Sequence, residues 1–190
     1  MALDLTSMLQ KTGALLHGHF RLSSGLHSAD YVQCALLLEH PRDARLVGTA
    51  LADLVRPMAP ALIASPALGG VIIGYAVAEA LDIPFVFTER KEGRMTVRRG
   101  FRIEPDASVV IVEDVVTTGR STRETAEVVR SAGGRVAGYA SILNRSGREN
   151  PFDAPYVSLA SMALETYSET ICPHCASGAP LDAPGSRHSK

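Results

Sequence analysis

The run of residues from Val109 to Ser121, VVIVEDVVTTGRS, constrains the fold of this chain more than any other feature. Four β-branched apolar residues lead into two adjacent carboxylates, a small polar turn follows, and the residues beyond it have helical spacing. This pattern predicts a buried parallel strand, a loop and a helix N-terminus. Free backbone N–H groups at such a terminus bind anions, and the hydroxyls of Thr117, Thr118 and Ser121 add donors. Gly119 allows the backbone to turn tightly around a phosphate.

The two carboxylates in this run, Glu113 and Asp114, require a different ligand group. Repulsion between like charges excludes them as phosphate ligands, whereas carboxylate oxygens accept hydrogen bonds from the hydroxyls of a sugar. One turn therefore offers acceptors for a ribose and donors for its 5-phosphate. The alternative is an ordinary connection between strand and helix that carries a solvated acidic pair.

Alternating strands and helices surround this run. Short apolar runs predict strands at 61–65, 83–87, 109–112, 136–143 and 156–160. Apolar residues at helical spacing predict helices at 3–11, 42–57, 69–81 and 123–132, and a hairpin is expected within 15–35. The alternation predicts a central parallel sheet with helices on both faces, in which ligands bind at the carboxyl ends of the strands.

Length and composition narrow the class of protein. A chain of 190 residues fits one domain, and 46% hydrophobic with 21% charged residues is a globular balance. The net charge of −1 shows no excess of basic residues of the kind expected in a nucleic-acid-binding protein. No apolar run has the length of a membrane span. Without a secretory signal pattern or a disulfide framework, the chain is expected to be cytoplasmic.

The strand, acid pair and hydroxyl turn resemble the phosphoribosyl diphosphate (PRPP) signature of type I phosphoribosyltransferases. Four further segments narrow the resemblance to the orotate phosphoribosyltransferase family, and it covers nearly the whole chain. GHFRLSSGLHSADYVQC at 18–34 resembles the family's N-terminal hood, and SPALGG at 65–70 resembles its diphosphate-binding loop. ERKEGR at 89–94 resembles the start of its flexible catalytic loop, and Asn144-Arg145 resembles its orotate-binding arginine.

The resemblance implies the type I phosphoribosyltransferase fold, with a central parallel sheet flanked by helices, a small N-terminal hood and a flexible catalytic loop. We expect a single domain over 1–175, with the hood at about 1–40 and a PRPP-binding core at about 41–165. The segment 176–190 is rich in Pro, Gly and Ser and is expected to be a mobile tail.

The implied activity transfers the ribose 5-phosphate group of PRPP to orotate, giving orotidine 5′-phosphate and diphosphate, in de novo pyrimidine synthesis. The implied cofactor is Mg²⁺, carried mainly by the diphosphate and ribose hydroxyls, with no protein metal ligand. Orotate and PRPP are the expected partners, with neither nucleic acid nor membrane. One alternative is a phosphoribosyltransferase for another base such as a purine, although a neutral purine needs no carboxylate clamp. The other is a non-catalytic PRPP-sensing regulator, which would need a DNA-binding helix pair or a basic face.

The resemblance also assigns site residues, most of them in the segments quoted above. The expected PRPP-binding residues are Glu113, Asp114, Val115, Val116, Thr117, Thr118, Gly119, Arg120 and Ser121. The expected orotate-binding residues are Thr117, Arg145 and Tyr31. The guanidinium of Arg145 is a planar fork that suits a carboxylate, and its alternative is a surface arginine at a strand end. Tyr31 would cover the orotate ring, or is an ordinary half-buried hairpin aromatic.

The basic segment ERKEGRMTVRRGFR at 89–102 contains six Arg or Lys residues among fourteen. A solvated hairpin and a mobile basic loop both fit it, and its place just before the PRPP strand favours a lid. The diphosphate leaving group gains negative charge as its bond to the ribose breaks, so cations in a lid would neutralise it. The expected catalytic residues are Arg90, Lys91, Arg94 and Asp114. The family's pattern further implies a homodimer in which Lys91 acts in the neighbouring subunit's site.

Four positions depart from the family's usual pattern. Arg94 replaces a loop lysine and keeps its charge, whereas Thr96 replaces a loop histidine and cannot act as a general acid near neutral pH. Gly69 replaces a lysine that contacts diphosphate, and Ser23 replaces a lysine of the hood.

Cys172-Pro-His-Cys175 has the spacing of half a zinc site. A structural zinc site needs four ligands, usually from a second Cys/His pair at similar spacing. The sequence shows no such pair nearby, since Cys34 is distant and His188 falls in the tail. The histidines nearest the hood also lack metal-ligand spacing, namely His17, His19 and His27, of which only His27 is a weak candidate for a site. We therefore expect the cysteine pair to be dispensable, with a zinc site and a redox pair as the alternatives.

Overall fold

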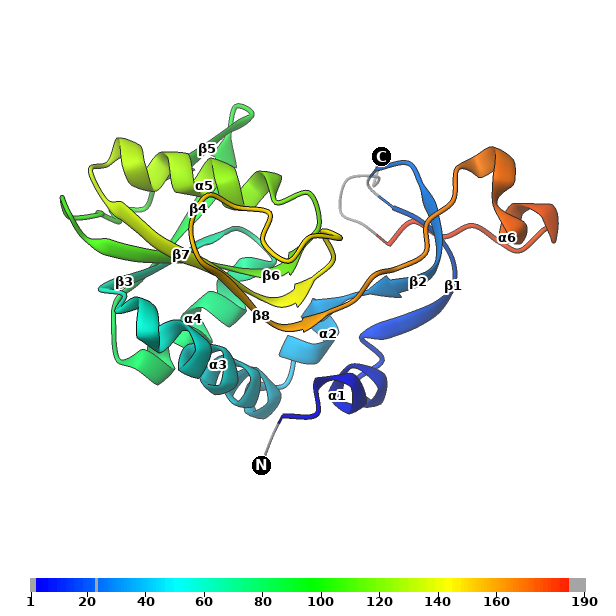
Figure 1. Ribbon diagram of the computed structural model, residues 1–190, viewed down its shortest axis with the longest axis horizontal. Coiled ribbons are helices and arrows are strands. Elements are labelled where there is room, and N and C mark those ends of the chain that lie inside the picture. The colour runs from blue at the N-terminus through cyan, green and yellow to red at the C-terminus, as the bar shows by residue number, and fades with distance from the viewer. Residues whose placement is uncertain (1–2, 23, 185–190) are drawn as a thin grey trace. The chain divides into compact units, whose positions relative to one another are not determined.

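The computed structural model describes residues 3–22 and 24–184 (Figure 1). Ser23 and His188 therefore lie outside the described residues. The described residues divide into two compact units, one formed by residues 3–5 and 38–162 and the other by residues 6–22, 24–37 and 163–184. In the described part of the chain, no helix has the length and apolar character needed to cross a membrane.

The first unit is built on a six-stranded sheet with the strand order β5-β4-β3-β6-β7-β8. Its strands are β3 (Leu62–Pro66), β4 (Phe85–Lys91), β5 (Arg94–Val97), β6 (Ser108–Val116), β7 (Arg135–Asn144) and β8 (Tyr156–Ser161). All neighbouring strands are parallel except β4 and β5, which are antiparallel. This confirms the predicted parallel sheet, and each predicted strand is present.

Helices cover both faces of this sheet, as Figure 1 shows. The helices α3 (Pro41–Val55) and α4 (Gly70–Leu81) pack together on one face, and α5 (Arg120–Ser131) covers the other. A short 3-10 turn, η1 (Arg56–Met58), follows α3. The apolar run at 109–112 is fully buried at the centre, as expected for a strand covered on both faces.

The order of the strands creates a switch point between β3 and β6. From β3 the chain passes through α4 to β4 on one side, whereas from β6 it passes through α5 to β7 on the other. The loops that leave β3 and β6 therefore diverge at the carboxyl edge of the sheet, where open α/β sheets bind ligands. These two loops are residues 67–69 and 117–119.

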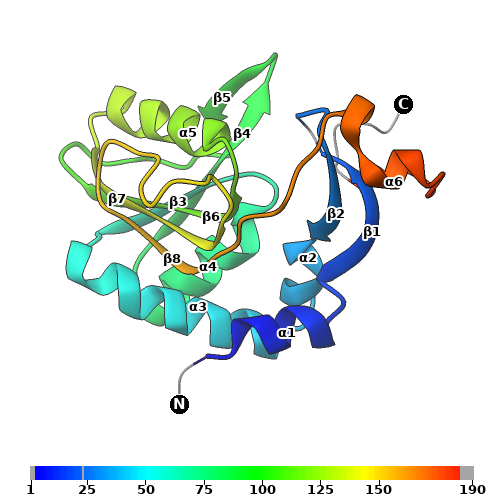
Figure 2. The same cartoon turned by 45° about the vertical axis from the view of Figure 1, so that its right-hand side comes forward.

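The basic segment forms a hairpin instead of an irregular loop. Strand β4 continues beyond its predicted end at residue 87, because Arg90 pairs with Met95 and Lys91 with Arg94 across to β5. Glu92 and Gly93 connect the strands with φ values of 52° and 80°, the positive values that a type I′ turn requires. Figure 2 shows this hairpin projecting beyond the rest of the sheet.

The second unit is organised around the predicted N-terminal hairpin, formed by β1 (Leu15–Arg21) and antiparallel β2 (His27–Val32). Its other elements are α1 (Leu5–Lys11), α2 (Cys34–Leu38), η2 (Glu169–Ile171) and α6 (Pro173–Ala176), and the terminal residues Leu5 of α1 and Leu38 of α2 are counted with the first unit.

The C-terminal segment belongs to this hairpin unit. Tyr167 exchanges two backbone hydrogen bonds with His27, and the Asp182 N–H donates to the carbonyl of His19 at 2.8 Å. Backbone hydrogen bonds and the ring of His19 connect residues 179–182 to β1, and the mobility expected of the segment 176–190 stays a prediction. The predicted hood likewise gains residues 163–184 and ends before Leu38.

Candidate active site at the carboxyl edge of the sheet

The acid pair lies at the carboxyl end of β6, where Glu113 is buried and Asp114 is half-buried. Burial raises the pKa of Glu113 well above its usual range, and the neighbouring charge of Asp114 raises it further. Burial also raises the pKa of Asp114, although the Val115 N–H, which donates to its Oδ1 at 2.7 Å, opposes this. Hydroxyl donors of a ligand would stabilise the ionised pair.

The loop after β3 comes into direct contact with this acid pair. A Cβ atom built on Gly69 would lie only 2.7 Å from Asp114 Oδ2, so a larger residue at this position would displace the carboxylate. Glycine at the position of the family's lysine therefore lets the backbone of the β3 loop approach Asp114. The two loops that flank the switch point form one site.

The turn after β6 has the conformation that the sequence predicts. Thr117 and Thr118 are exposed, and Gly119 precedes α5 with a φ of 69°, in the left-handed region. The Arg120 N–H is 3.4 Å from Thr118 Oγ1. The first turns of α4 and α5 contain no acidic residue, and both helices begin at the carboxyl edge. This edge therefore presents two helix N-termini that favour anions.

Arg145 is placed beside this turn by the backbone. Its N–H donates to the carbonyl of Val116 at 2.7 Å, which fixes the end of β7 next to Thr117. Asn144 orders the loop that follows, because its Oδ1 accepts from the backbone N–H and the hydroxyl of Ser146 and its amide donates to the carbonyl of Arg148. The structure thus brings Arg145, Thr117 and the acid pair to one edge.

Tyr31, the third expected orotate ligand, lies on β2 in the second unit. Its ring packs against that of Phe20, with the ring centroids 5.7 Å apart. Its role in covering orotate stays a prediction.

Four of the six cations in the basic segment form two groups. At the base, Arg98 and Arg99 both bind the carboxylate of Glu89, at 3.3 and 3.0 Å. At the end of the hairpin, Lys91 and Arg94 face each other across the register and are exposed. The charge that is available to a ligand is therefore concentrated at the end.

Arg90 differs from both groups because it forms an ion pair with Glu124 of α5. Glu124 also accepts from Arg120 Nε at 2.9 Å. Although burial raises the pKa of Glu124, hydrogen bonds from Arg120 and Arg90 outweigh it and lower that pKa below its usual value. Sequence reasoning missed Glu124, for which the four-residue spacing from Arg120 was the available signal.

Comparison with known proteins agrees with this geometry. The sequence model of the phosphoribosyl transferase domain matches residues 35–176. The orotate phosphoribosyltransferase of Carboxydothermus hydrogenoformans is 46% identical over 187 residues, covering 97% of this chain and 98% of that protein. The chain belongs to the orotate phosphoribosyltransferase family.

Other members of the family show the same relationship. The orotate phosphoribosyltransferase of Thermotoga maritima is 45% identical over 186 residues, covering 98% of this chain and all of that protein. Among solved structures, the Aeropyrum pernix orotate phosphoribosyltransferase superposes with a TM-score of 0.68 at 28% identity, covering 83% of this chain and 93% of the other. The predicted family and fold are confirmed.

Proposed function

We propose that this chain transfers the ribose 5-phosphate group of PRPP to orotate, giving orotidine 5′-phosphate and diphosphate, and so serves pyrimidine synthesis. The observation that carries the proposal is the direct approach of the Gly69 loop to the acid pair, beside the hydroxyl turn and Arg145. That edge matches PRPP group by group, and relatives about 45% identical over nearly the whole chain are named orotate phosphoribosyltransferases.

The ribose and its 5-phosphate would bind along the turn after β6. Glu113 and Asp114 would accept hydrogen bonds from the ribose hydroxyls. The hydroxyls of Thr117, Thr118 and Ser121, with the N–H groups at the start of α5, would donate to the 5-phosphate. The remaining residues of this turn would contribute backbone contacts, namely Val115, Val116, Gly119 and Arg120.

The diphosphate would lie at the N-terminus of α4, next to Gly69. The orotate ring nitrogen releases its proton to water and forms a bond to the anomeric carbon, while the bond from that carbon to the diphosphate oxygen breaks and both its electrons leave with the diphosphate. Lys91 and Arg94, exposed at the hairpin end, would neutralise the growing charge and help exclude water. Arg90 would also contribute once its ion pair with Glu124 is broken and its guanidinium binds the leaving group instead.

Orotate would be held by its carboxylate at Arg145, with Thr117 beside it and Tyr31 over the ring. A guanidinium binds a carboxylate through two parallel hydrogen bonds. This contact would distinguish orotate from a neutral purine, which offers no carboxylate.

Mg²⁺ would arrive with PRPP. Among the residues described, Glu113 and Asp114 are not part of any group of three or more potential metal ligands. Such a pair suits a cation that keeps most of its ligands on the diphosphate and water, which is how Mg²⁺ usually binds with phosphates. When bound, the ion would neutralise charge on the leaving group.

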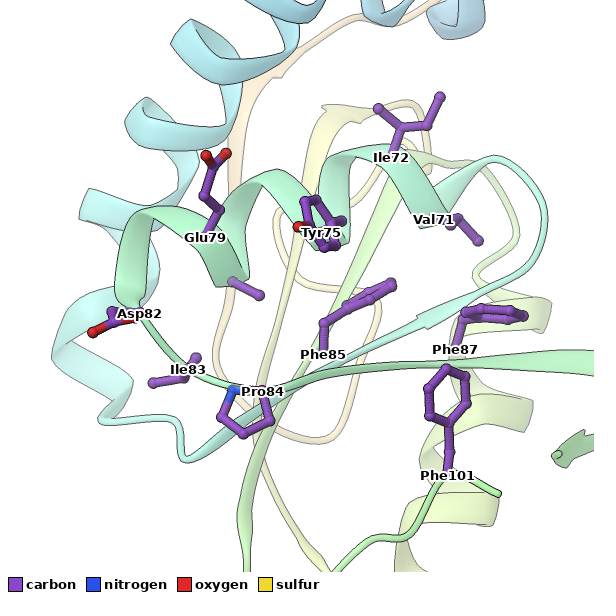
Figure 3. A pocket seen from close by; sticks show the side chains of 11 residues that line it. Val71, Ile72, Tyr75, Glu79, Asp82, Ile83, Pro84, Phe85, Phe87 and Phe101 are labelled. Atoms are coloured by element: carbon purple, nitrogen blue, oxygen red, sulfur yellow. The ribbon is translucent and has the colours of Figure 1, made fainter. Parts of the chain in front are cut away.

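The enzyme would act as a homodimer in the cytoplasm. An apolar groove of about 940 Å³ runs along α4 and β4, between Tyr75, Phe85, Phe87 and Phe101 (Figure 3). Ile72 and Tyr75 on its rim are 48% and 62% exposed, an apolar surface that suits a second copy of the chain. By resemblance to the family, Lys91 of one subunit would act in the other subunit's site. None of the three cysteines forms a disulfide.

The direct test follows the loss of orotate absorbance after PRPP and Mg²⁺ are added to the purified chain. We expect stoichiometric formation of orotidine 5′-phosphate and diphosphate, and no turnover without the divalent cation. Parallel reactions with adenine and hypoxanthine should show no transfer. Turnover of a purine in place of orotate would contradict the assignment of Arg145 as a carboxylate ligand.

A further inference from the structure

Four potential metal ligands converge in the second unit, away from any role in the proposed reaction. His19 comes from β1, His27 from β2, Cys172 from the position just before α6 and Cys175 from within α6. One ligand atom from each lies within 4.8 Å of every other. His19, His27 and Cys172 are each less than 5% exposed, and Cys175 is half-buried. We call these four residues the His/Cys cluster.

The separations within the His/Cys cluster are close to those around one metal ion. His19 Nε2 is 2.9 Å from His27 Nδ1, 3.5 Å from Cys172 Sγ and 3.6 Å from Cys175 Sγ, and the last sulfur is 3.2 Å from His27 Nδ1. Bonds of about 2.0–2.3 Å to a tetrahedral zinc ion put ligand atoms about 3.3–3.8 Å apart. For these four pairs, shifts of a few tenths of an ångström would reach the tetrahedral separations, and the two remaining pairs lie within 4.8 Å.

We propose that the His/Cys cluster is a structural zinc site that fastens the C-terminal segment to the β1–β2 hairpin. Two thiolates and two neutral imidazoles carry a charge of −2, which Zn²⁺ cancels, so the buried site would be neutral. Soft sulfur ligands and two imidazoles in tetrahedral geometry favour zinc over Mg²⁺. Four protein ligands leave no open position, which distinguishes a structural site from a catalytic one.

The surroundings of the ligands support this assignment. His19 Nδ1 lies 2.9 Å from the carbonyl of Ala179, and donation to that carbonyl leaves Nε2 free to bind a metal. Such an outer hydrogen bond is the usual means of orienting a metal-bound histidine. The backbones of His19 and His27 are held by Asp182 and Tyr167, so both rings are already placed.

This arrangement removes the reason for regarding the cysteine pair as half a site. The missing ligand pair is His19 and His27, which the fold brings back from about 150 positions away in the chain. The hairpin unit is small and has few buried side chains, and units of this size commonly use a metal as a substitute for a larger core.

The test uses the full chain and follows metal binding directly. We expect about one zinc ion per chain in protein purified without chelators, by inductively coupled plasma mass spectrometry. After chelation, titration with Co²⁺ should give the intense visible bands of tetrahedral cobalt together with thiolate charge-transfer absorption. Zn²⁺ should then displace the Co²⁺ and remove both signals.

Variants assign the ligands. Cys175→Ser and His19→Gln should lose the tetrahedral cobalt spectrum. His17→Gln is the matched control and should keep the tetrahedral cobalt spectrum. His17 lies two residues from His19 on the same strand, but its ring is hydrogen-bonded to Asp30. If a ligand variant does not fold, thiol labelling of the wild-type chain replaces it: Cys175, partly exposed, should react after chelation and be protected by Zn²⁺.

Two results would overturn the proposal. One is a folded wild-type chain that neither contains zinc nor shows the cobalt spectrum, including the case in which Cys172 and Cys175 are instead recovered as a disulfide. The other is full cobalt binding by a folded Cys172→Ser/Cys175→Ser variant, which would place the ion elsewhere. Neither result depends on the transferase assay, so failure here is distinguishable from failure of the proposed function.

Discussion

The turn after β6 and the His/Cys cluster are assembled in opposite ways. The turn presents the exposed hydroxyls of Thr117 and Thr118 beside an acid pair in which Asp114 is half-buried and keeps acceptor capacity beyond the one hydrogen bond from Val115. The cluster is buried, and its ligand atoms contact one another. The first suits ligands that enter and leave in each turnover, whereas the second suits an ion that stays. Substitutions at the carboxyl edge should therefore change activity, and substitutions in the cluster should change stability.

The largest effect on activity is expected for Lys91→Ala. Loss of a cation that stabilises the departing diphosphate should lower kcat about 10²–10³-fold. The melting temperature should stay unchanged because Lys91 is exposed at the hairpin end. Steady-state kinetics and thermal unfolding of the same preparation measure the two effects.

Complementation then decides which subunit Lys91 serves. Random mixing of equal amounts of Lys91→Ala and Asp114→Asn chains, assayed at a PRPP concentration too low for the Asp114→Asn homodimer to turn over, should restore about a quarter of wild-type activity, since half the dimers would have one complete site. No recovery after confirmed subunit exchange would show that Lys91 acts within its own chain or not at all.

Arg145→Ala should weaken orotate binding by about 2–4 kcal/mol and leave PRPP binding nearly unchanged, because a charge-assisted pair with the carboxylate is lost. Separate calorimetric titrations with each ligand measure this. Arg148→Ala is the matched control, because the hydrogen bonds of Arg148 in this loop are made by its backbone carbonyl and N–H, which the substitution keeps. An equal loss for both ligands would give Arg145 a structural role.

Asp114→Asn should weaken PRPP binding by about 1.5–3 kcal/mol, because the amide replaces one charged acceptor with a donor. Folding should be little affected. Asp53→Asn on α3, where Asp53 forms an exposed pair with Arg56, controls for the loss of a charge. If the Asp114→Asn variant has the same kcat/KM for PRPP as the wild type, the acid pair does not bind the ribose.

The smallest effect is a change in pH dependence. Ribose hydroxyls favour the ionised acid pair, and burial raises the pKa of Glu113. Wild-type kcat/KM for PRPP should therefore fall as the pH drops through that raised pKa. Glu113→Gln should lower the maximum of the pH profile of kcat/KM and abolish this decrease at low pH. Any decrease at low pH that is due to protonation of the PRPP phosphates should remain. If kcat/KM of the Glu113→Gln variant falls at low pH as it does in the wild type, Glu113 is not the group that causes the decrease.

The same pKa has a consequence for the free enzyme, of the opposite sign. A carboxyl group whose pKa is raised by folding binds more protons in the folded state, so its contribution becomes destabilising as pH rises above the unfolded pKa. Replacing Glu113 by Gln removes this penalty, and the ligand-free variant should gain stability relative to wild type towards neutral pH.

A region could be predicted from the sequence when its residues lie close together along the chain, and less well when they come from separate segments. Glu113 to Ser121 are consecutive, so strand, acid pair and turn could be recognised from local pattern alone. Arg145 could be placed because parallel strands bring their carboxyl ends to one edge. The Arg90–Glu124 pair and the contact of Gly69 with Asp114 needed the fold, since they join separate segments.

The hairpin unit was predicted less completely for the same reason. The alternation within 15–35 sufficed for β1 and β2, but nothing local in ASGAPLDAP indicates that Ala179 and Asp182 would bind β1. The pairing of His19 with Cys175 depends on that return of the chain. A tail rich in Pro and Gly could equally have been mobile, which is what its composition indicated.

The most direct test of the contrast between the two regions is thermal unfolding of the zinc-loaded chain with and without PRPP and Mg²⁺. The same measurement is made on Asp114→Asn and on Cys172→Ser/Cys175→Ser. We predict that Asp114→Asn keeps the ligand-free melting temperature and loses most of the rise caused by PRPP. The double cysteine variant should melt at a lower temperature without ligand and keep the rise. A cysteine variant with the wild-type melting temperature, or an Asp114→Asn chain still fully stabilised by PRPP, would contradict the account.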